Sequence, residues 1–228
     1  MRDVFLGIQI VLCSRHTLAK NSGGVSRPGT GRIWEKIEAA LPFQLTPSQR
    51  EVIAEIAADM ASPHRMNRLL QGDVGSGKTL VALRAMIQAH ESGWQAALMA
   101  PTQILAEQHY LNFRRLLDPL GIPVVLRTSA RKEGSSDADL FSPAKSSVPP
   151  LVVGTHALLF EGAEFEKLGL VVIDEQHKFG VLQRSRLIGR ADVPDVLVMT
   201  ATPIPRTLTL TIYGDLDVST IDERPKAR

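Results

Sequence analysis

One segment constrains this chain more than any other: residues 72–79, GDVGSGKT, match the pattern G-x-x-x-x-G-K-[ST]. Glycines in this pattern let the backbone curl until successive N–H groups point inward, where they bind phosphate oxygens. Lys78 is then placed to reach the β- and γ-phosphates of a nucleotide, and the Thr79 hydroxyl to bind Mg²⁺. A glycine-rich turn between a strand and a helix is the structural alternative. The residues expected to hold ATP and Mg²⁺ are Gly72, Gly75, Ser76, Gly77, Lys78 and Thr79.

A second feature is an acidic pair that follows an apolar run and could bind the metal ion of the same nucleotide site. The apolar run Val171–Ile173 ends in Asp174 and Glu175, and ligands of open α/β sheets bind at the carboxyl ends of strands. We expect Asp174 to hold Mg²⁺ from a strand next to that of the phosphate loop, and Glu175 to polarise the attacking water. A solvated acidic turn is the alternative. Asp174, Glu175 and Lys78 are therefore the candidate catalytic residues.

The chain alternates between helical patterns and short apolar strands. Thr46 is a suitable N-cap and Pro47 a suitable first residue for a helix, and further helices are expected over residues 78–92 and 101–117. Uniformly apolar strands separated by helices indicate a parallel sheet that is covered on both faces. Residues 128–150, rich in serine and proline, predict a loop. The expected strands are residues 68–71, 96–100, 123–126, 151–153, 168–173 and 196–199.

Composition excludes several classes of protein. Lys+Arg 26 against Asp+Glu 24 gives a net charge of +2, so a claim of nucleic-acid binding must rest on motifs. The single cysteine, Cys13, excludes an internal disulfide framework and a cysteine-based zinc site. The early apolar run, residues 4–13, is far shorter than the roughly 20 residues of a spanning helix, so we expect no membrane partner.

Four further motifs follow the phosphate loop in a fixed order: APTQILAEQH, VVGTHALL, DEQH and TATPIPRT. With the loop, they resemble the first motor lobe of superfamily 2 DNA helicases, and most closely those that remodel branched DNA in recombination and repair. The resemblance implies a RecA-like, three-layer α/β/α domain over residues 41–228, with residues 1–40 as a helical linker remnant. It also implies ATP hydrolysis, DNA as a partner and a cytoplasmic location. The transcription-repair coupling translocase is similar here, but it tends to differ at Ala157 and in DEQH.

The same resemblance implies roles for single residues. Gln49 would read the adenine edge, although its spacing from Thr46 also matches a capping box. Thr102 is equally suited to an N-cap, and His109 and Tyr110 are expected to pack in a helix. The DNA-contacting candidates are Pro101, Thr102, Gly154, Thr155 and His156, with a plain turn as the alternative for His156. The candidates that couple the nucleotide site to DNA are His177, Thr200 and Thr202, with a simple strand end as the alternative for the two threonines.

The resemblance also leads us to expect partners beyond this chain. Helicases of this superfamily hydrolyse ATP between two RecA-like lobes, and the second lobe supplies arginines for the γ-phosphate. We expect that lobe and an N-terminal wedge domain to be required, because an arginine finger contributes about 10³–10⁵ in rate. Alone, the chain should bind Mg·ATP but hydrolyse it poorly. A non-catalytic, nucleotide-dependent DNA-binding module is the alternative.

Overall fold

The computed structural model describes residues 24–128, 149–155, 165–174, 194–201 and 216–223. These residues form helices and strands in alternation, as the apolar runs predict. The helices are α2 (Arg32–Ala40), α3 (Pro47–Ala61), α4 (Lys78–Glu91) and α5 (Gln103–Leu117), followed by a short 3₁₀ turn, η1 (Asp118–Leu120). The strands are β1 (Asn67–Gly72), β2 (Gln95–Met99), β3 (Val124–Arg127), β4 (Leu151–Gly154), β5 (Leu168–Asp174), β6 (Asp195–Thr200) and β7 (Asp217–Ile221).

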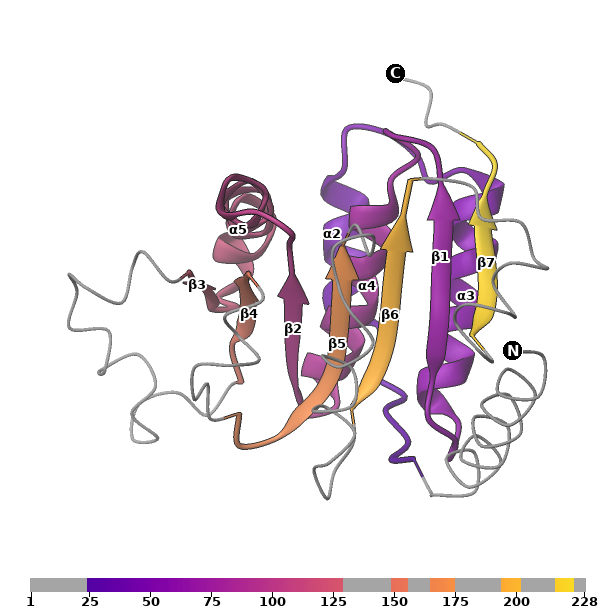
Figure 1. Ribbon diagram of the computed structural model, residues 1–228, viewed down its shortest axis with the longest axis horizontal. Helices are drawn as coiled ribbons and strands as arrows, with labels where there is room; N and C mark the ends of the chain where they lie inside the picture. The colour runs from indigo at the N-terminus through magenta and orange to yellow at the C-terminus, as the bar shows by residue number, and fades with distance from the viewer. Residues whose placement is uncertain (1–23, 129–148, 156–164, 175–193, 202–215, 224–228) are drawn as a thin grey trace, which may run out of the picture.

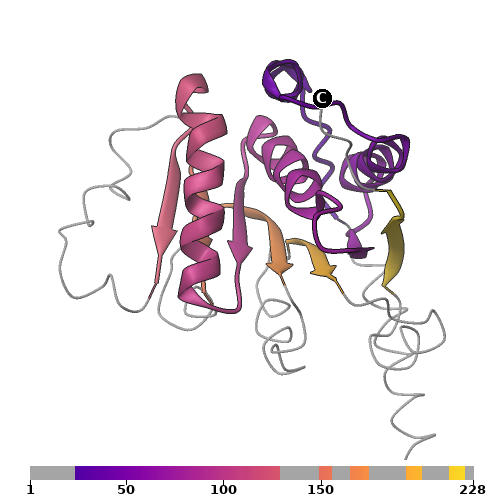
Figure 2. The same ribbon diagram turned by 90° about the horizontal axis from the view of Figure 1, so that it is seen from above.

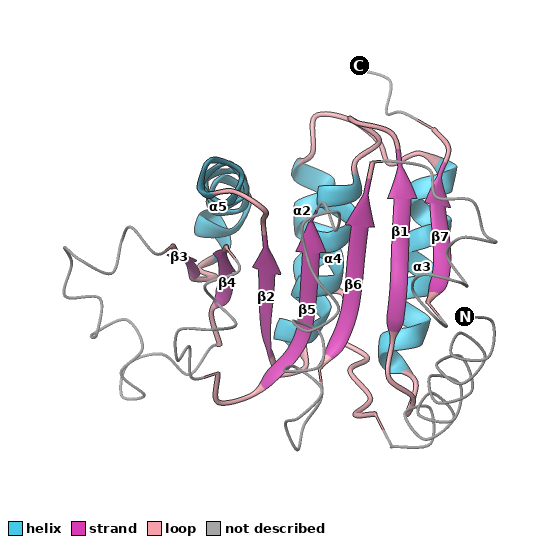
Figure 3. Ribbon diagram, viewed as in Figure 1, coloured by secondary structure: helices cyan, strands magenta, loops and turns pink. Residues whose placement is uncertain are grey.

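The strands form a single sheet in the order β3-β4-β2-β5-β6-β1-β7, and every neighbouring pair is parallel (Figure 1). All carboxyl ends therefore lie along one edge of the sheet, which Figure 3 shows as arrowheads pointing the same way. Since the phosphate loop follows β1 and Asp174 ends β5, the topology gathers the predicted site at this edge.

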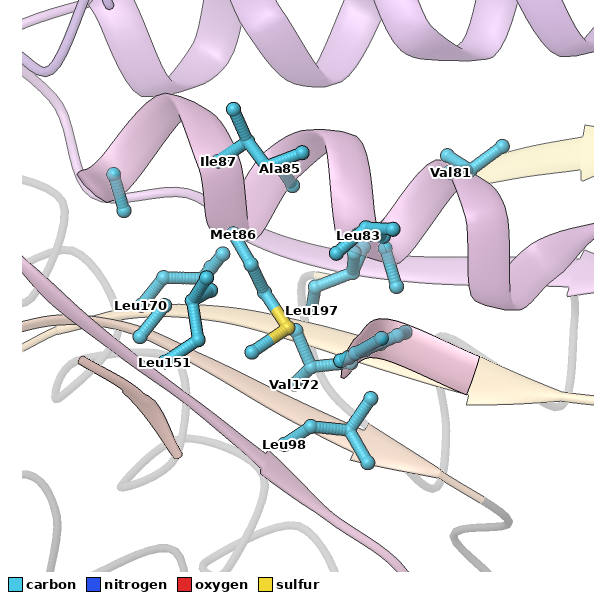
Figure 4. Close-up of a cluster of buried hydrophobic side chains, with 14 of the residues drawn as sticks. Val81, Leu83, Ala85, Met86, Ile87, Leu98, Leu151, Leu170, Val172 and Leu197 are labelled. Carbon is cyan, nitrogen blue, oxygen red and sulfur yellow. The ribbon is translucent and has the colours of Figure 1, made fainter. Parts of the chain in front are cut away.

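All four described α-helices lie on one side of the sheet, where α3, α4 and α5 contact the strands and α2 packs on α4 (Figure 2). Alternate strand residues and the apolar sides of the helices form one large core, in which Met86 of α4 reaches toward Val172 and Leu197 (Figure 4). The other strand residues, such as Val171 and Ile173, form a second buried cluster on the opposite face. Strands buried on both faces explain why the sequence shows continuous apolar runs without polar alternation.

The described part of the N-terminal segment, residues 24–40, lies against the same body. Trp34 and Ile37 of α2 belong to the large core, and Arg27 is 1% exposed. The Arg27 guanidinium donates to the Asp195 carboxylate at 2.7 Å and lies 4.4 Å from the centre of a Trp94 ring. Residues 24–31 thus form a strap along the sheet's amino-terminal edge. The domain boundary at residue 41 stays a prediction.

The fold class is confirmed as a parallel RecA-like sheet flanked by helices. Each predicted strand and helix is present, with ends that differ by a residue or two. Strand β7 was not predicted. Most of the expected loop 128–150 lies outside the described residues. No helix in the described part of the chain is long and apolar enough to cross a bilayer.

Candidate nucleotide site

The phosphate loop connects the end of β1 to the start of α4, as its sequence predicts. A Cβ at Gly72 would lie 2.6 Å from the Ser76 hydroxyl and 3.1 Å from the Ile221 carbonyl oxygen, so a side chain there would displace the Ser76 hydroxyl and crowd β7. Gly75 and Gly77 have φ angles of +83° and +88°, a region that residues with a Cβ rarely adopt. The loop therefore has the curled backbone that a phosphate cradle requires, and the N-terminus of α4 adds its positive dipole.

The polar groups of the loop fit a triphosphate. The Lys78 ammonium donates to the carbonyl oxygens of Gly72 at 2.6 Å and Asp73 at 2.8 Å, so it bends back over the loop. Within the described residues, the Ser76 hydroxyl is buried without a hydrogen-bond partner. Orphaned buried polar atoms are uncommon and often indicate a missing ligand or water. With the Thr79 hydroxyl at the start of α4, the donor set matches phosphate oxygens and a magnesium ion.

Gln49 is fully buried, and its side chain connects the start of helix α3 to the phosphate loop. Its side-chain oxygen accepts from the Thr46 N–H at 3.0 Å, while its own N–H donates to the Thr46 hydroxyl at 3.2 Å, which completes the capping box. Its amide nitrogen donates to the Ser76 carbonyl at 2.7 Å. The capping box is therefore confirmed, and the contact with the loop is a finding that sequence spacing did not indicate. The adenine contact stays a prediction.

Asp174 lies at the carboxyl end of β5 and is paired with a residue that sequence reasoning assigned to packing. Its Oδ2 lies 2.8 Å from Nε2 of His109, and the two side chains are only 15% and 10% exposed. His109 belongs to α5, whose apolar residues pack on β3 and β4. A signal was present in the sequence: α5 begins at the strand edge where Asp174 was expected, and it carries a histidine on its apolar side. His109 is thus part of the candidate site.

Register places the loop and the carboxylate at the same level of the sheet. Gln71 pairs with Thr200 of β6, and Asp174 pairs with the preceding residue, Met199. We had expected Asp174 on the strand next to that of the phosphate loop. This expectation is wrong, because β6 lies between β5 and β1. Two strand spacings of about 4.8 Å separate β1 from β5. Thr200, a predicted coupling residue, therefore lies between the two halves of the site.

The predicted DNA-contacting segments come together at a neighbouring part of the same edge. Met99 of β2 pairs with Gly154 of β4, and the Ala100 N–H donates to the Gly154 carbonyl at 2.8 Å. Pro101 and Thr102 thus continue from β2 directly beside Gly154 and Thr155, which continue from β4. The Thr102 hydroxyl accepts from the Leu105 N–H at 3.3 Å, which confirms the N-cap. Contact with DNA stays a prediction for all four residues.

Four predicted site residues lie outside the described residues: Glu175, His156, His177 and Thr202. Their proposed roles therefore stay predictions. The described site consists of the glycine loop, an ammonium, two hydroxyls, a buried amide and one carboxylate held by a histidine. This set suits a nucleotide triphosphate and one divalent cation.

Comparison with known proteins agrees with this chemistry. The sequence profile of the DEAD/DEAH box helicases matches residues 46–211, which is most of the chain. The chain belongs to the DEAD/DEAH box helicase family. Membership of this family implies ATP as the nucleotide. The match begins at the N-cap of α3 and includes the phosphate loop, Asp174 and the DNA-contacting candidates.

Among its relatives the chain is similar to RecG. It is 52% identical over 198 residues to "ATP-dependent DNA helicase RecG" of Synechocystis, covering 87% of this chain and 24% of the relative. It is 49% identical over 227 residues to that of Borreliella burgdorferi, covering 100% of this chain and 32% of the relative. A solved structure, "Structure of RecG bound to three-way DNA junction", matches with TM-score 0.79 and 40% identity over 100% of this chain and 30% of that chain.

The predicted resemblance to ATP-dependent DNA helicases is therefore confirmed. These relatives all have the RecG name, which favours this interpretation over the coupling translocase. The chain spans about a quarter to a third of the length of the relatives it matches.

Proposed function

We propose that this chain is the ATP-binding first motor lobe of an ATP-dependent DNA helicase that remodels branched DNA in recombination and repair. The observation that carries the proposal is the common edge of one parallel sheet. That edge holds the glycine loop, Asp174 and the paired segments Pro101–Thr102 and Gly154–Thr155. The RecG protein of the solved structure is bound to a three-way DNA junction, which supports branched DNA as the substrate class. Such a role implies a cytoplasmic location.

The residues of the candidate nucleotide site would have different roles in binding and hydrolysing ATP. Lys78 would exchange the carbonyl oxygens of Gly72 and Asp73 for phosphate oxygens, so its ammonium has polar partners with or without nucleotide. Thr79 and Asp174 would hold Mg²⁺, which when bound neutralises charge on the phosphate oxygens. Glu175, the next residue along the chain, would orient the attacking water. We expect slow hydrolysis by this lobe alone, because arginines of a second lobe contribute about 10³–10⁵ in rate.

Calorimetry of ATP binding in Mg²⁺ tests the nucleotide site. Removing the Lys78 ammonium deletes charge-assisted contacts worth about 1.5–3 kcal/mol. Lys78→Ala should therefore weaken ATP binding at least tenfold. Lys36→Ala changes an exposed lysine of α2 and is the matched control, with an expected affinity equal to that of the wild type. An unchanged affinity in Lys78→Ala would contradict the assignment of the loop.

A second assay tests the motor. The chain is mixed with a separately produced second lobe of a RecG relative, and ATP hydrolysis is measured with and without a DNA three-way junction. We expect DNA-stimulated hydrolysis only in the mixture. Intact ATP binding with no stimulated hydrolysis would instead favour a non-catalytic, nucleotide-dependent DNA-binding module. Hydrolysis of several ATP per second by the chain alone would contradict the need for a second lobe.

A further inference from the structure

We propose that His109 is a positioning residue of the nucleotide site: it fixes the orientation of the Asp174 carboxylate through which the chain binds its divalent cation. This inference rests on the proposed function, since it gives Asp174 the role of a metal ligand. The observation behind it is the 2.8 Å contact between Nε2 of His109 and Oδ2 of Asp174. The two residues are 65 positions apart in the chain and come from different layers of the fold.

The chemistry of the pair defines the direction of the hydrogen bond. An ionised carboxylate only accepts, so Nε2 of His109 must be the protonated nitrogen and must donate. Both side chains are largely buried, at 10% and 15% exposed, and hydrogen bonds to charged groups in such surroundings are stronger than those at the surface. His109 thus engages Oδ2 of Asp174, and in this proposal the cation binds the other oxygen.

The imidazole itself is held by its neighbours on α5. Phe113 lies one turn further along the helix, with ring centroids 6.2 Å apart and a tilt of 43°. Phe113 is 1% exposed and belongs to the large core, as does Leu117 at the end of the helix. The packing of α5 on β3 and β4 therefore fixes the position of the His109 ring. The hydrogen bond from this ring then fixes the orientation of the Asp174 carboxylate.

A carboxylate that binds a metal needs such a partner. Residues that hydrogen-bond to metal ligands orient them, and removing them typically lowers metal affinity by about 10–100-fold. Asp174 ends its strand, and the backbone alone allows its side chain more than one staggered rotamer. Without His109, the carboxylate would lose its fixed orientation, and binding the cation would have to restore that order.

The test measures nucleotide affinity rather than turnover. A fluorescent, non-hydrolysable ATP analogue is titrated into the full chain twice, once in Mg²⁺ and once in EDTA, and the ratio of the two affinities gives the contribution of the metal. His109→Ala should lower that ratio about tenfold and leave the affinity in EDTA within about twofold of the wild type. His109→Gln keeps an N–H donor close to the position of Nε2, so it should recover most of the ratio.

Further variants separate the possible failures. Asp174→Asn should lower the same ratio; if it does not, the proposed metal site is wrong. If Asp174→Asn lowers the ratio and His109→Ala does not, only the role of His109 is overturned. Equal losses in Mg²⁺ and EDTA for His109→Ala would also overturn it, because they would indicate damage to the packing of α5. Tyr110→Phe, a neighbouring change on the same helix, is the control and should leave the ratio unchanged.

Discussion

Gln49 shows how much a single side chain contributes to this site. Its amide forms hydrogen bonds to Thr46 on one side and to the Ser76 carbonyl on the other, and it has no exposed surface. A Cβ at Gly77 would meet the same amide nitrogen, so the amide and the glycine loop fit closely. Gln49 therefore links the first turn of α3 directly to the phosphate loop.

Gln49→Glu tests whether this contact or adenine recognition dominates nucleotide binding. A carboxylate can still accept from the Thr46 N–H but cannot donate to the Ser76 carbonyl, so two acceptors would face each other. We expect the affinities for ATP and GTP to fall together, by about tenfold, since a buried unsatisfied group costs about 1–3 kcal/mol. Competitive displacement of a fluorescent nucleotide measures both. A loss confined to ATP would show instead that Gln49 reads the base.

At the scale of elements, uniformly apolar strands and clear helix starts made most of the fold predictable. Strand β7 was missed because Asp217, Ser219 and Thr220 interrupt its apolar pattern. Among the described strands it lies at the edge of the sheet and pairs only with β1, so it needs no continuous apolar run. The apolar periodicity of a sequence shows which side of a helix or strand is buried. It does not show which residues of other helices or strands that side contacts. Periodicity therefore gave no indication of the pair Arg27–Asp195, and for His109 it indicated only the buried side of α5, without naming Asp174 as the partner.

Thr102 serves both an element and a proposed interface, and two substitutions separate these roles. Thr102→Ala removes the cap of α5 and should cost about 1 kcal/mol of unfolding free energy. Thr102→Asp keeps an oxygen that caps the helix, so stability should be preserved, but the added negative charge should repel phosphates. We therefore expect Thr102→Asp, and not Thr102→Ala, to bind single-stranded DNA more weakly than the wild type. Fluorescence anisotropy at fixed salt measures this affinity. Equal DNA affinity in Thr102→Asp and the wild type would remove Thr102 from the interface.

At the scale of the whole molecule, one buried ion pair joins Arg27, near the start of the described chain, to Asp195 of β6. Arg27 and Asp195 are each about 2% exposed in their side chains, and Asp195 also accepts from the Met66 N–H at 2.9 Å. Removing one partner leaves the other charge buried and unpaired. Arg27→Met should therefore lower the free energy of unfolding by about 3–5 kcal/mol in urea titrations.

The exposed pair Arg50–Glu38 offers the control for that measurement. The side chain of Arg50 is 55% exposed, so Arg50→Met should cost less than about 1 kcal/mol. If the two substitutions cost the same, the strap of residues 24–31 would not be part of the cooperative fold.

Asp195 also predicts a pH dependence. Burial raises its pKa from 3.8 to about 6, because desolvation outweighs the attraction of Arg27 and the hydrogen bond from Met66. The folded state thus keeps the proton at pH values where the unfolded state has lost it. The contribution of this residue to stability is complete below about pH 3.8 and is lost as the pH rises through about 6.

Asp195→Asn should remove that loss. Urea titrations between pH 4 and 7 would show it as a stability difference between wild type and variant that changes across this window and is constant above it. A difference that is independent of pH would mean that Asp195 is ionised throughout in the folded protein.

The strap has a mechanical consequence. Arg27 is anchored to Asp195 at the first residue of β6, and Glu91 accepts hydrogen bonds from the N–H groups of Thr30, Gly31 and Ile33. A pull applied to the chain through Gly24 would therefore load these contacts first, at the sheet's amino-terminal edge. The six residues of β1 then span about 20 Å to the edge that holds Lys78. The strap and the phosphate loop thus lie at opposite ends of the same parallel sheet, so a pull on the strap would reach the nucleotide site only through the strands.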